Sequence, residues 1–203
     1  MKRALSDSED AYQVRTILGM AGIYLICFGI FGGIWSVRAT MAYRLYARII
    51  LDRPDTETVL RLSRQSLRAY SRQYALCIRA AETAFAAVEK APNPQAAEQL
   101  RNETVYYVGR GSDLNPWLME LHYLKARLAA RESPEAAVAI WEEYVEWHFW
   151  DPGNLEILAR FQEEAGQLRE ALSTLDYLKA WPRHNAWRKR LREMLEKKEA
   201  ASS

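Results

Sequence analysis

The chain has few cysteines and little net charge. It has only two cysteines among 203 residues. Cys27 lies in a long apolar run and Cys77 lies outside it, so we expect no intrachain disulfide. The net charge is only +2, which argues against binding of nucleic acid by the molecule as a whole.

Motifs of the common enzyme classes are also missing. The sequence has no Gly-x-Ser-x-Gly, no phosphate-binding loop and no dinucleotide fingerprint. Its three histidines, His122, His148 and His184, are not spaced as metal ligands. The Gly-Arg-Gly-Ser segment at 109–112 is better explained as the end of a helix over about 95–108. We therefore expect no catalytic, cofactor-binding or metal-binding residue, and no enzymatic activity.

Proline, valine and isoleucine are thinly spread. Runs of Ala, Leu, Glu and Arg dominate the chain, and these residues favour helix over strand. The sequence therefore predicts an all-α fold.

One long apolar run organises the chain. Residues 16–37 contain no charged side chain and would extend roughly 33 Å as a helix, enough to cross a bilayer core of about 30 Å. The run is too long for a signal peptide and ends in bulky Ile34, Trp35 and Val37, so we expect it to stay as a membrane anchor. Residues 1–15 are expected to be a short N-terminal tail, and the helix is expected to continue to about residue 51.

The apolar run contains five of the nine glycines. A stripe of small residues at helical spacing could let another helix approach closely. Its candidate packing residues are Gly19, Gly22, Gly29, Gly33 and Ser36. Because glycine is common in membrane helices in any case, a packing role and a plain compositional origin are both open.

Residues 55–112 form an arginine-rich helical region. Apolar spacing predicts one long helix from Asp55 to Lys90. Its opposite face carries five arginines: Arg61, Arg64, Arg68, Arg72 and Arg79. This basic face is interpreted as a solvated surface, as a site for anionic lipid headgroups or as a docking site for an acidic partner.

Prolines divide the remaining chain at regular intervals. Pro116, Pro134 and Pro152 are eighteen residues apart, a rhythm typical of helices joined by tight turns. We expect helices at about 116–131, 134–149, 154–165, 168–181 and 184–198, with a disordered tail over 199–203.

Residues 154–182 have large, small and turn-forming residues at a characteristic spacing: Leu155, Leu158, Ala159, Gly166, Ala171 and Leu175. In this pattern the segment resembles a tetratricopeptide repeat (TPR), in which the glycine permits the turn and the two alanines let antiparallel helices approach. Gln162 and Leu178 depart from the pattern. A looser repeat precedes it. The resemblance implies a stack of antiparallel helical hairpins over 113–198, closed by a capping helix, that binds another protein.

Aromatic residues are concentrated in the helix expected at 134–149. The candidate protein-binding aromatics are Trp141, Tyr144, Trp147, Phe149 and Trp150. The alternative is that this helix is central in the stack and buries its rings.

These observations favour a membrane-anchored adaptor or assembly factor. The alternatives are a non-catalytic accessory subunit of an integral membrane complex and a protein that binds anionic lipid. The expected partners are proteins, including an integral membrane protein or a second copy, together with membrane lipid but no nucleic acid. We expect a single-pass protein of a bacterial-type inner membrane. The short tail favours a periplasmic domain, whereas the later arginines favour the cytoplasmic side.

Overall fold

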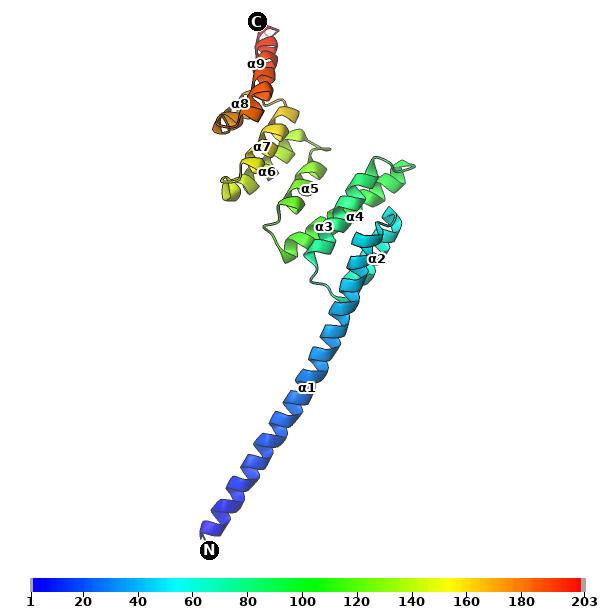
Figure 1. Cartoon of the computed structure of the whole chain (residues 1–203), viewed down its shortest axis with the longest axis vertical. Helices are drawn as coiled ribbons and strands as arrows, with labels where there is room; N and C mark the ends of the chain where they lie inside the picture. The colour runs from blue at the N-terminus through cyan, green and yellow to red at the C-terminus, as the bar shows by residue number, and fades with distance from the viewer. Residues whose placement is uncertain (1, 202–203) are drawn as a thin grey trace. The chain divides into compact units, whose positions relative to one another are not determined.

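The computed structural model describes the backbone of residues 2–201, and the side-chain surroundings of residue 20 and of residues 22–201. Within 2–201 all regular secondary structure is helical, as predicted. The chain forms two compact units, Met1–Arg72 and Gln73–Ser203. Figure 1 follows the helices along the chain.

The first unit is a hairpin of α1 (Lys2–Asp52) and α2 (Thr56–Ala69). α1 continues past the apolar run to Asp52, close to the expected end, but it also begins at Lys2, so the segment expected as a tail is helical. The chain turns at Arg53, whose φ is 44°. Asp55 then caps α2, because its carboxylate accepts a hydrogen bond of 3.0 Å from the Thr58 amide.

α2 runs antiparallel to α1. The Ser66 hydroxyl donates to the Ala42 carbonyl at 3.0 Å. Closer to the N-terminal half of α1, the Arg38 guanidinium donates to the carbonyls of Arg68 and Ala69. These contacts place the last turn of α2 beside Arg38.

The prediction of one helix from Asp55 to Lys90 was wrong. α2 ends at Ala69 and α3 begins at Tyr74, with extended backbone at Tyr70. No glycine or proline causes this break. Arg38 binds the carbonyls at the end of α2 and Tyr70 packs on Trp35, so contacts with α1 end the helix where sequence periodicity continues.

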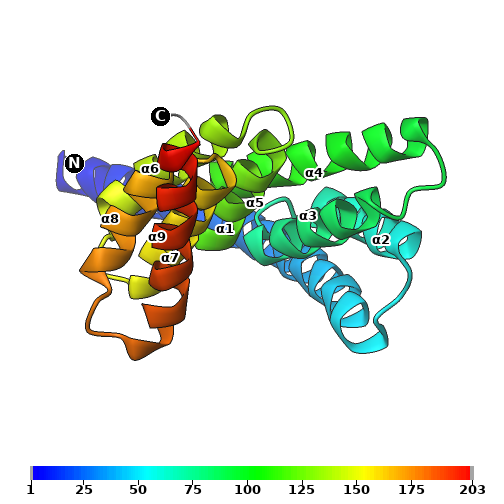
Figure 2. The same cartoon turned by 90° about the horizontal axis from the view of Figure 1, so that it is seen from above.

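The second unit is a succession of antiparallel helices. Its elements are α3 (Tyr74–Val88), α4 (Pro94–Leu114), α5 (Met119–Ala129), α6 (Pro134–His148), α7 (Pro152–Glu164), α8 (Leu168–Tyr177), the short 3₁₀ helix η1 (Pro182–His184) and α9 (Asn185–Ala200). α3 packs on α4, α5 on α6 and α7 on α8, and α9 covers α8. Figures 1 and 2 show these hairpins following one another.

Local signals set the helix boundaries. Ser133 caps α6 and Asp151 caps α7, each directly before a proline in the first turn. Gly166 has φ of +71° between α7 and α8, a conformation that glycine adopts without strain. The predicted turn at this glycine is therefore present.

One predicted helix end was wrong. α4 passes through the glycines at 109–112 and ends at Leu114. A Cβ atom on Gly111 would lie 2.7 Å from Leu121 Cδ1 and 3.2 Å from Cys77 Cβ. Gly111 thus serves close packing of α3, α4 and α5 within the second unit.

Two clusters of buried residues lie in the part of the stack formed by α5 to α9. The first lies mainly between α6 and α7 and comprises Ala126, Ala137, Val138, Trp141, Tyr144, Val145, Leu158 and Phe161. The second lies between α7, α8 and α9 and comprises Ala159, Leu168, Ala171, Leu175, Leu178 and Leu191. Ala159 and Ala171 are fully buried, at positions where the resemblance predicts small residues between helices.

Candidate protein-binding groove

The first helices of successive hairpins line a groove in the second unit. It has a volume of about 540 Å³ and is lined by Glu82 of α3, by Met119, Glu120, Tyr123, Leu124 and Arg127 of α5, and by Ile157, Arg160, Phe161 and Glu164 of α7. α5 and α7 each present one face to it, since their lining residues recur at three and four positions. The groove is therefore a product of the repeat, in which equivalent helices stand side by side.

The floor of the groove is aromatic and rigidly supported. The rings of Tyr123 and Phe161 lie 6.0 Å apart between centroids. Each also packs on the buried Trp141 ring, at 6.1 Å and 6.0 Å. Tyr123 is 39% exposed and Phe161 is only 2% exposed, so Tyr123 presents an aromatic surface over a packed core.

Charged side chains of both signs surround this floor. Arg127 of α5 donates to both carboxylate oxygens of Glu164 on α7, at 3.0 and 3.3 Å. Arg160 pairs with Glu156 at 2.9 Å and lies over the Trp187 ring. Such an arrangement can recognise an apolar side chain flanked by charges.

Two of the five candidate aromatics are core residues. Trp141 is 0% exposed and Tyr144 is 6% exposed, and the Trp141 indole donates to the Asn154 carbonyl at 2.9 Å. Burial raises the pKa of Tyr144, and the negative charges of Glu120 and Asp151 raise it further. These two rings support the fold and cannot meet a partner directly.

The other three candidates are exposed. Trp147, Phe149 and Trp150 have 61%, 66% and 66% of their surface accessible. Phe149 and Trp150 are edge to face at 5.7 Å, and His148 lies 5.4 Å from Trp150. Trp117, from the loop before α5, approaches His148 at 6.0 Å.

The predicted basic face is divided. Arg61, Arg64 and Arg68 are exposed on α2 and Arg72 follows that helix, all in the first unit. Arg79 lies on α3, in the second unit, 3.7 Å from Glu82. Because α2 and α3 are separate helices, the five arginines do not form one continuous helix face.

The glycine stripe of α1 is open where the structure describes it. A Cβ atom on Gly22, Gly29 or Gly33 would meet nothing within 4 Å, and Ser36 is exposed. Gly19 lies outside the residues whose side-chain surroundings are described. Of the described helices, one is long and apolar enough to cross a membrane, by length and composition alone: the stretch Gly22–Asp52.

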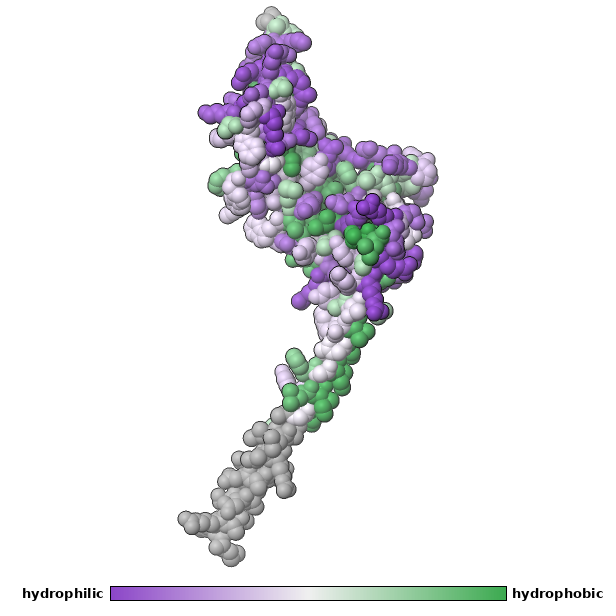
Figure 3. Space-filling view, viewed as in Figure 1, coloured by the Kyte–Doolittle hydropathy of each residue, from purple (hydrophilic) through white to green (hydrophobic). Residues whose placement is uncertain are grey.

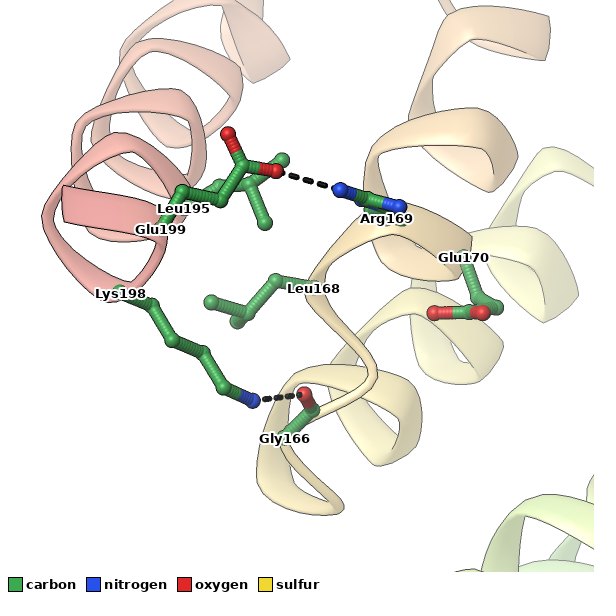
Figure 4. A pocket seen from close by; sticks show the side chains of 7 residues that line it. All are labelled: Gly166, Leu168, Arg169, Glu170, Leu195, Lys198 and Glu199. Carbon is green, nitrogen blue, oxygen red and sulfur yellow. Dashed lines mark hydrogen bonds and ion pairs between the residues drawn. The ribbon is translucent and has the colours of Figure 1, made fainter. Parts of the chain in front are cut away.

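A second cavity, of about 450 Å³, lies between the α7–α8 turn and α9. Figure 4 shows Arg169 and Lys198 reaching across it. Arg169 pairs with Glu199 at 2.6 Å, and the Lys198 ammonium donates to the Gly166 carbonyl at 3.4 Å. These interactions hold the capping helix, α9, against α8 and the turn before it. We therefore interpret the cavity as a gap in the packing of these helices and not as a binding site.

The sequence does not single out the residues that line the groove. Tyr123, Arg127 and Phe161 are each an ordinary helical residue in isolation. The resemblance to a helical repeat is the available signal, since in such a stack equivalent helices of successive hairpins lie side by side. No group of three or more His, Cys, Asp or Glu residues that could hold a metal occurs among the side chains that the structure describes.

Comparison with known proteins supports the repeat architecture. No family model and no curated protein sequence matches the chain. The crystal structure of TTC0263, a thermophilic TPR protein in Thermus thermophilus, matches it with a TM-score of 0.55 and 16% sequence identity, over 79% of this chain and 98% of that chain. This likeness concerns the fold, and the fold of this chain is TPR-like.

Proposed function

We propose that this chain is a membrane-anchored adaptor or assembly factor that binds partner proteins and catalyses no reaction itself. The groove between the first helices of the hairpins carries the proposal. A TPR-like fold suggests a role in protein–protein interaction in general, and here the groove combines an accessible aromatic floor with charges from two helices.

The groove favours a segment with an apolar anchor. Tyr123 and Phe161 form a floor that does not have to be ordered on binding, because Trp141 already holds both rings. Aromatic residues in such supported positions contribute disproportionately to binding. Arg127 and Glu164 offer charges for the polar residues on either side of the anchor.

The apolar part of α1 is the proposed anchor. Residues 16–37 supply the uncharged stretch and the helix continues without a break to Asp52. The bacterial-type inner membrane is the proposed location. We favour the periplasmic side for the second unit, and a topology reporter fused at Ser203 distinguishes this from the cytoplasmic side.

An accessory subunit of an integral membrane complex is the second candidate. The open surfaces of Gly22, Gly29 and Gly33 favour it, because small residues allow another membrane helix to come close. That helix would belong to another protein or to a second copy of this chain.

A matched pair of tyrosine variants tests the groove. Tyr123→Ser removes the accessible part of the floor, whereas Tyr177→Ser makes the same change on α8, where the side chain is 80% exposed. Full-length variants are purified in a mild detergent and co-purifying proteins are quantified by mass spectrometry. We expect the amount of co-purifying partner protein to fall about tenfold or more with Tyr123→Ser and to be unchanged with Tyr177→Ser. Equal retention in both variants would contradict the groove as the binding site.

Glycine variants separate the two candidate functions. Gly29→Leu with Gly33→Leu should release co-purifying membrane subunits if the chain is an accessory subunit, and should leave groove partners bound. Cys27→Leu is the control, since Cys27 lies about 160° around the helix from Gly29 and so on the side opposite the stripe. Resistance of the chain to carbonate extraction, measured in parallel, tests the anchor itself; extraction into the soluble fraction would rule out both candidates.

A further inference from the structure

The end of α2 is fixed beside the end of the apolar run. Arg38 Nε donates to the Ala69 carbonyl at 2.9 Å, and Arg38 Nη2 donates to the Arg68 carbonyl at 3.1 Å. The rings of Trp35 and Tyr70 meet edge to face at 5.8 Å. Two hydrogen bonds and one ring contact therefore hold the last turn of α2 at the level of residues 35–38.

This level is that of a membrane interface if α1 crosses the bilayer. Val37 is the last residue of the uncharged run and Arg38 is the first charge after it. Tryptophan and tyrosine, here represented by the Trp35–Tyr70 pair, are enriched where hydrocarbon meets headgroups. Figure 3 shows hydrophobic residues along the apolar part of α1.

Charge is segregated along the hairpin. Arg68 lies in the last turn of α2 and Arg72 follows shortly after; both are exposed, and neither forms an ion pair with any residue of the described range. The acids that follow the apolar run, Asp52, Asp55 and Glu57, lie at the opposite end of the hairpin. Asp52 is about 22 Å along α1 from Val37, well beyond the Debye length of about 8 Å at physiological salt.

The other two arginines of α2 lie farther from the interface. Ser66 is level with Ala42, which is about 8 Å beyond Val37, and Arg61 is roughly another 8 Å up the hairpin. Attraction to a charged surface falls off within a Debye length. Arg68, whose carbonyl is level with Arg38, is thus distinguished from Arg61 by depth rather than by residue type.

We propose that Arg68 and Arg72 bind the phosphate groups of anionic phospholipids in the leaflet where α1 leaves the membrane. The hairpin holds Arg68 at headgroup depth and Arg72 follows it by four residues. Guanidinium groups pair with phosphate oxygens through two parallel hydrogen bonds. Arg38 uses two of its N–H groups on the carbonyls of α2 and thereby positions the end of that helix. The proposal rests on α1 being a membrane span.

The test measures the affinity of the full-length chain for single lipids. Fluorescent phosphatidylglycerol and fluorescent phosphatidylcholine are titrated into the protein in neutral detergent micelles. One variant combines Arg68→Gln with Arg72→Gln. The control combines Arg53→Gln with Arg61→Gln, which removes the same charge from the part of the hairpin distant from the membrane.

We expect the dissociation constant for phosphatidylglycerol to rise about fivefold for each interfacial arginine removed, with phosphatidylcholine binding unchanged. The control variant should change it by less than about twofold. An equal loss of affinity for phosphatidylglycerol in both variants, or no loss in the variant that combines Arg68→Gln with Arg72→Gln, would overturn the proposal. Competition by glycerophosphoglycerol at the same concentration as the lipid would also overturn it, since the site would then bind a free phosphate ester.

A separate measurement shows whether α1 is inserted in the membrane. Carbonate extraction of membranes that contain the unmodified chain reports insertion without reference to lipid type. If the chain is extracted, both the proposed anchor and this lipid site are wrong. If it stays in the membrane while the interfacial variant binds phosphatidylglycerol normally, the lipid site alone is wrong.

Discussion

Two glycines of α4, two residues apart, should respond oppositely to the same substitution. A Cβ atom at Gly109 would meet nothing within 4 Å, so Gly109→Ala should stabilise the helix by about 0.8–1 kcal/mol through its better helix propensity. At Gly111 the same gain is offset, because the new atom would lie 2.7 Å from Leu121 Cδ1 and 3.2 Å from Cys77 Cβ. Forcing a methyl group into a packed core costs about 1–3 kcal/mol.

The difference in unfolding free energy between the two alanine variants should therefore be about 1–3 kcal/mol. Urea titration of the full-length protein in detergent, followed by tryptophan fluorescence, measures it. Leu121→Val, which shortens the obstructing side chain, should recover part of the loss in Gly111→Ala while destabilising the unmodified protein. If Gly111→Ala were as stabilising as Gly109→Ala, the close packing of α4 against α5 would be refuted.

Two further predictions concern buried polar groups. Burial raises the pKa of the Cys77 thiol from about 9 to about 11. Since the folded state holds the proton more tightly, its contribution to stability should be complete below pH 9 and should be lost as the pH rises to 11. Urea titrations at several pH values measure this decline, and Cys77→Ala should remove that part of it. Trp141→Phe removes the indole N–H that donates to the Asn154 carbonyl and should lower the unfolding free energy by about 2–4 kcal/mol. A loss under about 1 kcal/mol would mean that this hydrogen bond contributes little to stability.

Features governed by neighbouring residues in the chain were predictable. The cap at Ser133 and the turn at Gly166 follow from local chemistry that the sequence displays. The small residues Ala159 and Ala171 follow from the resemblance to a repeat, because antiparallel helices need them at the same places in each hairpin. The all-α class and the hairpin order were accordingly available without a structure.

Features set by distant residues were not. The break after Ala69 depends on Arg38, about thirty positions earlier, which binds the final carbonyls of α2. The passage of α4 through Gly111 depends on contacts with Cys77 and Leu121. Neither relation leaves a trace in local periodicity.

The candidate aromatics illustrate the same limit within one helix. Trp141 and Trp147 both lie on apolar faces of α6, yet the first is buried and the second is exposed. The difference arises because the two positions lie about 120° apart around the helix, and only Trp141 packs on Phe161 of α7. Periodicity shows which residues share a face, but not which of two apolar faces a neighbouring helix covers.

The ion pair across the groove has a consequence for how binding responds to salt. Arg127 and Glu164 join successive first helices above the aromatic floor, and both side chains are partly solvent-exposed. An uncharged apolar segment whose binding opens this pair benefits from added salt, because salt weakens exposed ion pairs. Its affinity should therefore increase with ionic strength, whereas a partner that supplies its own charges to the two residues should bind more weakly as salt is added.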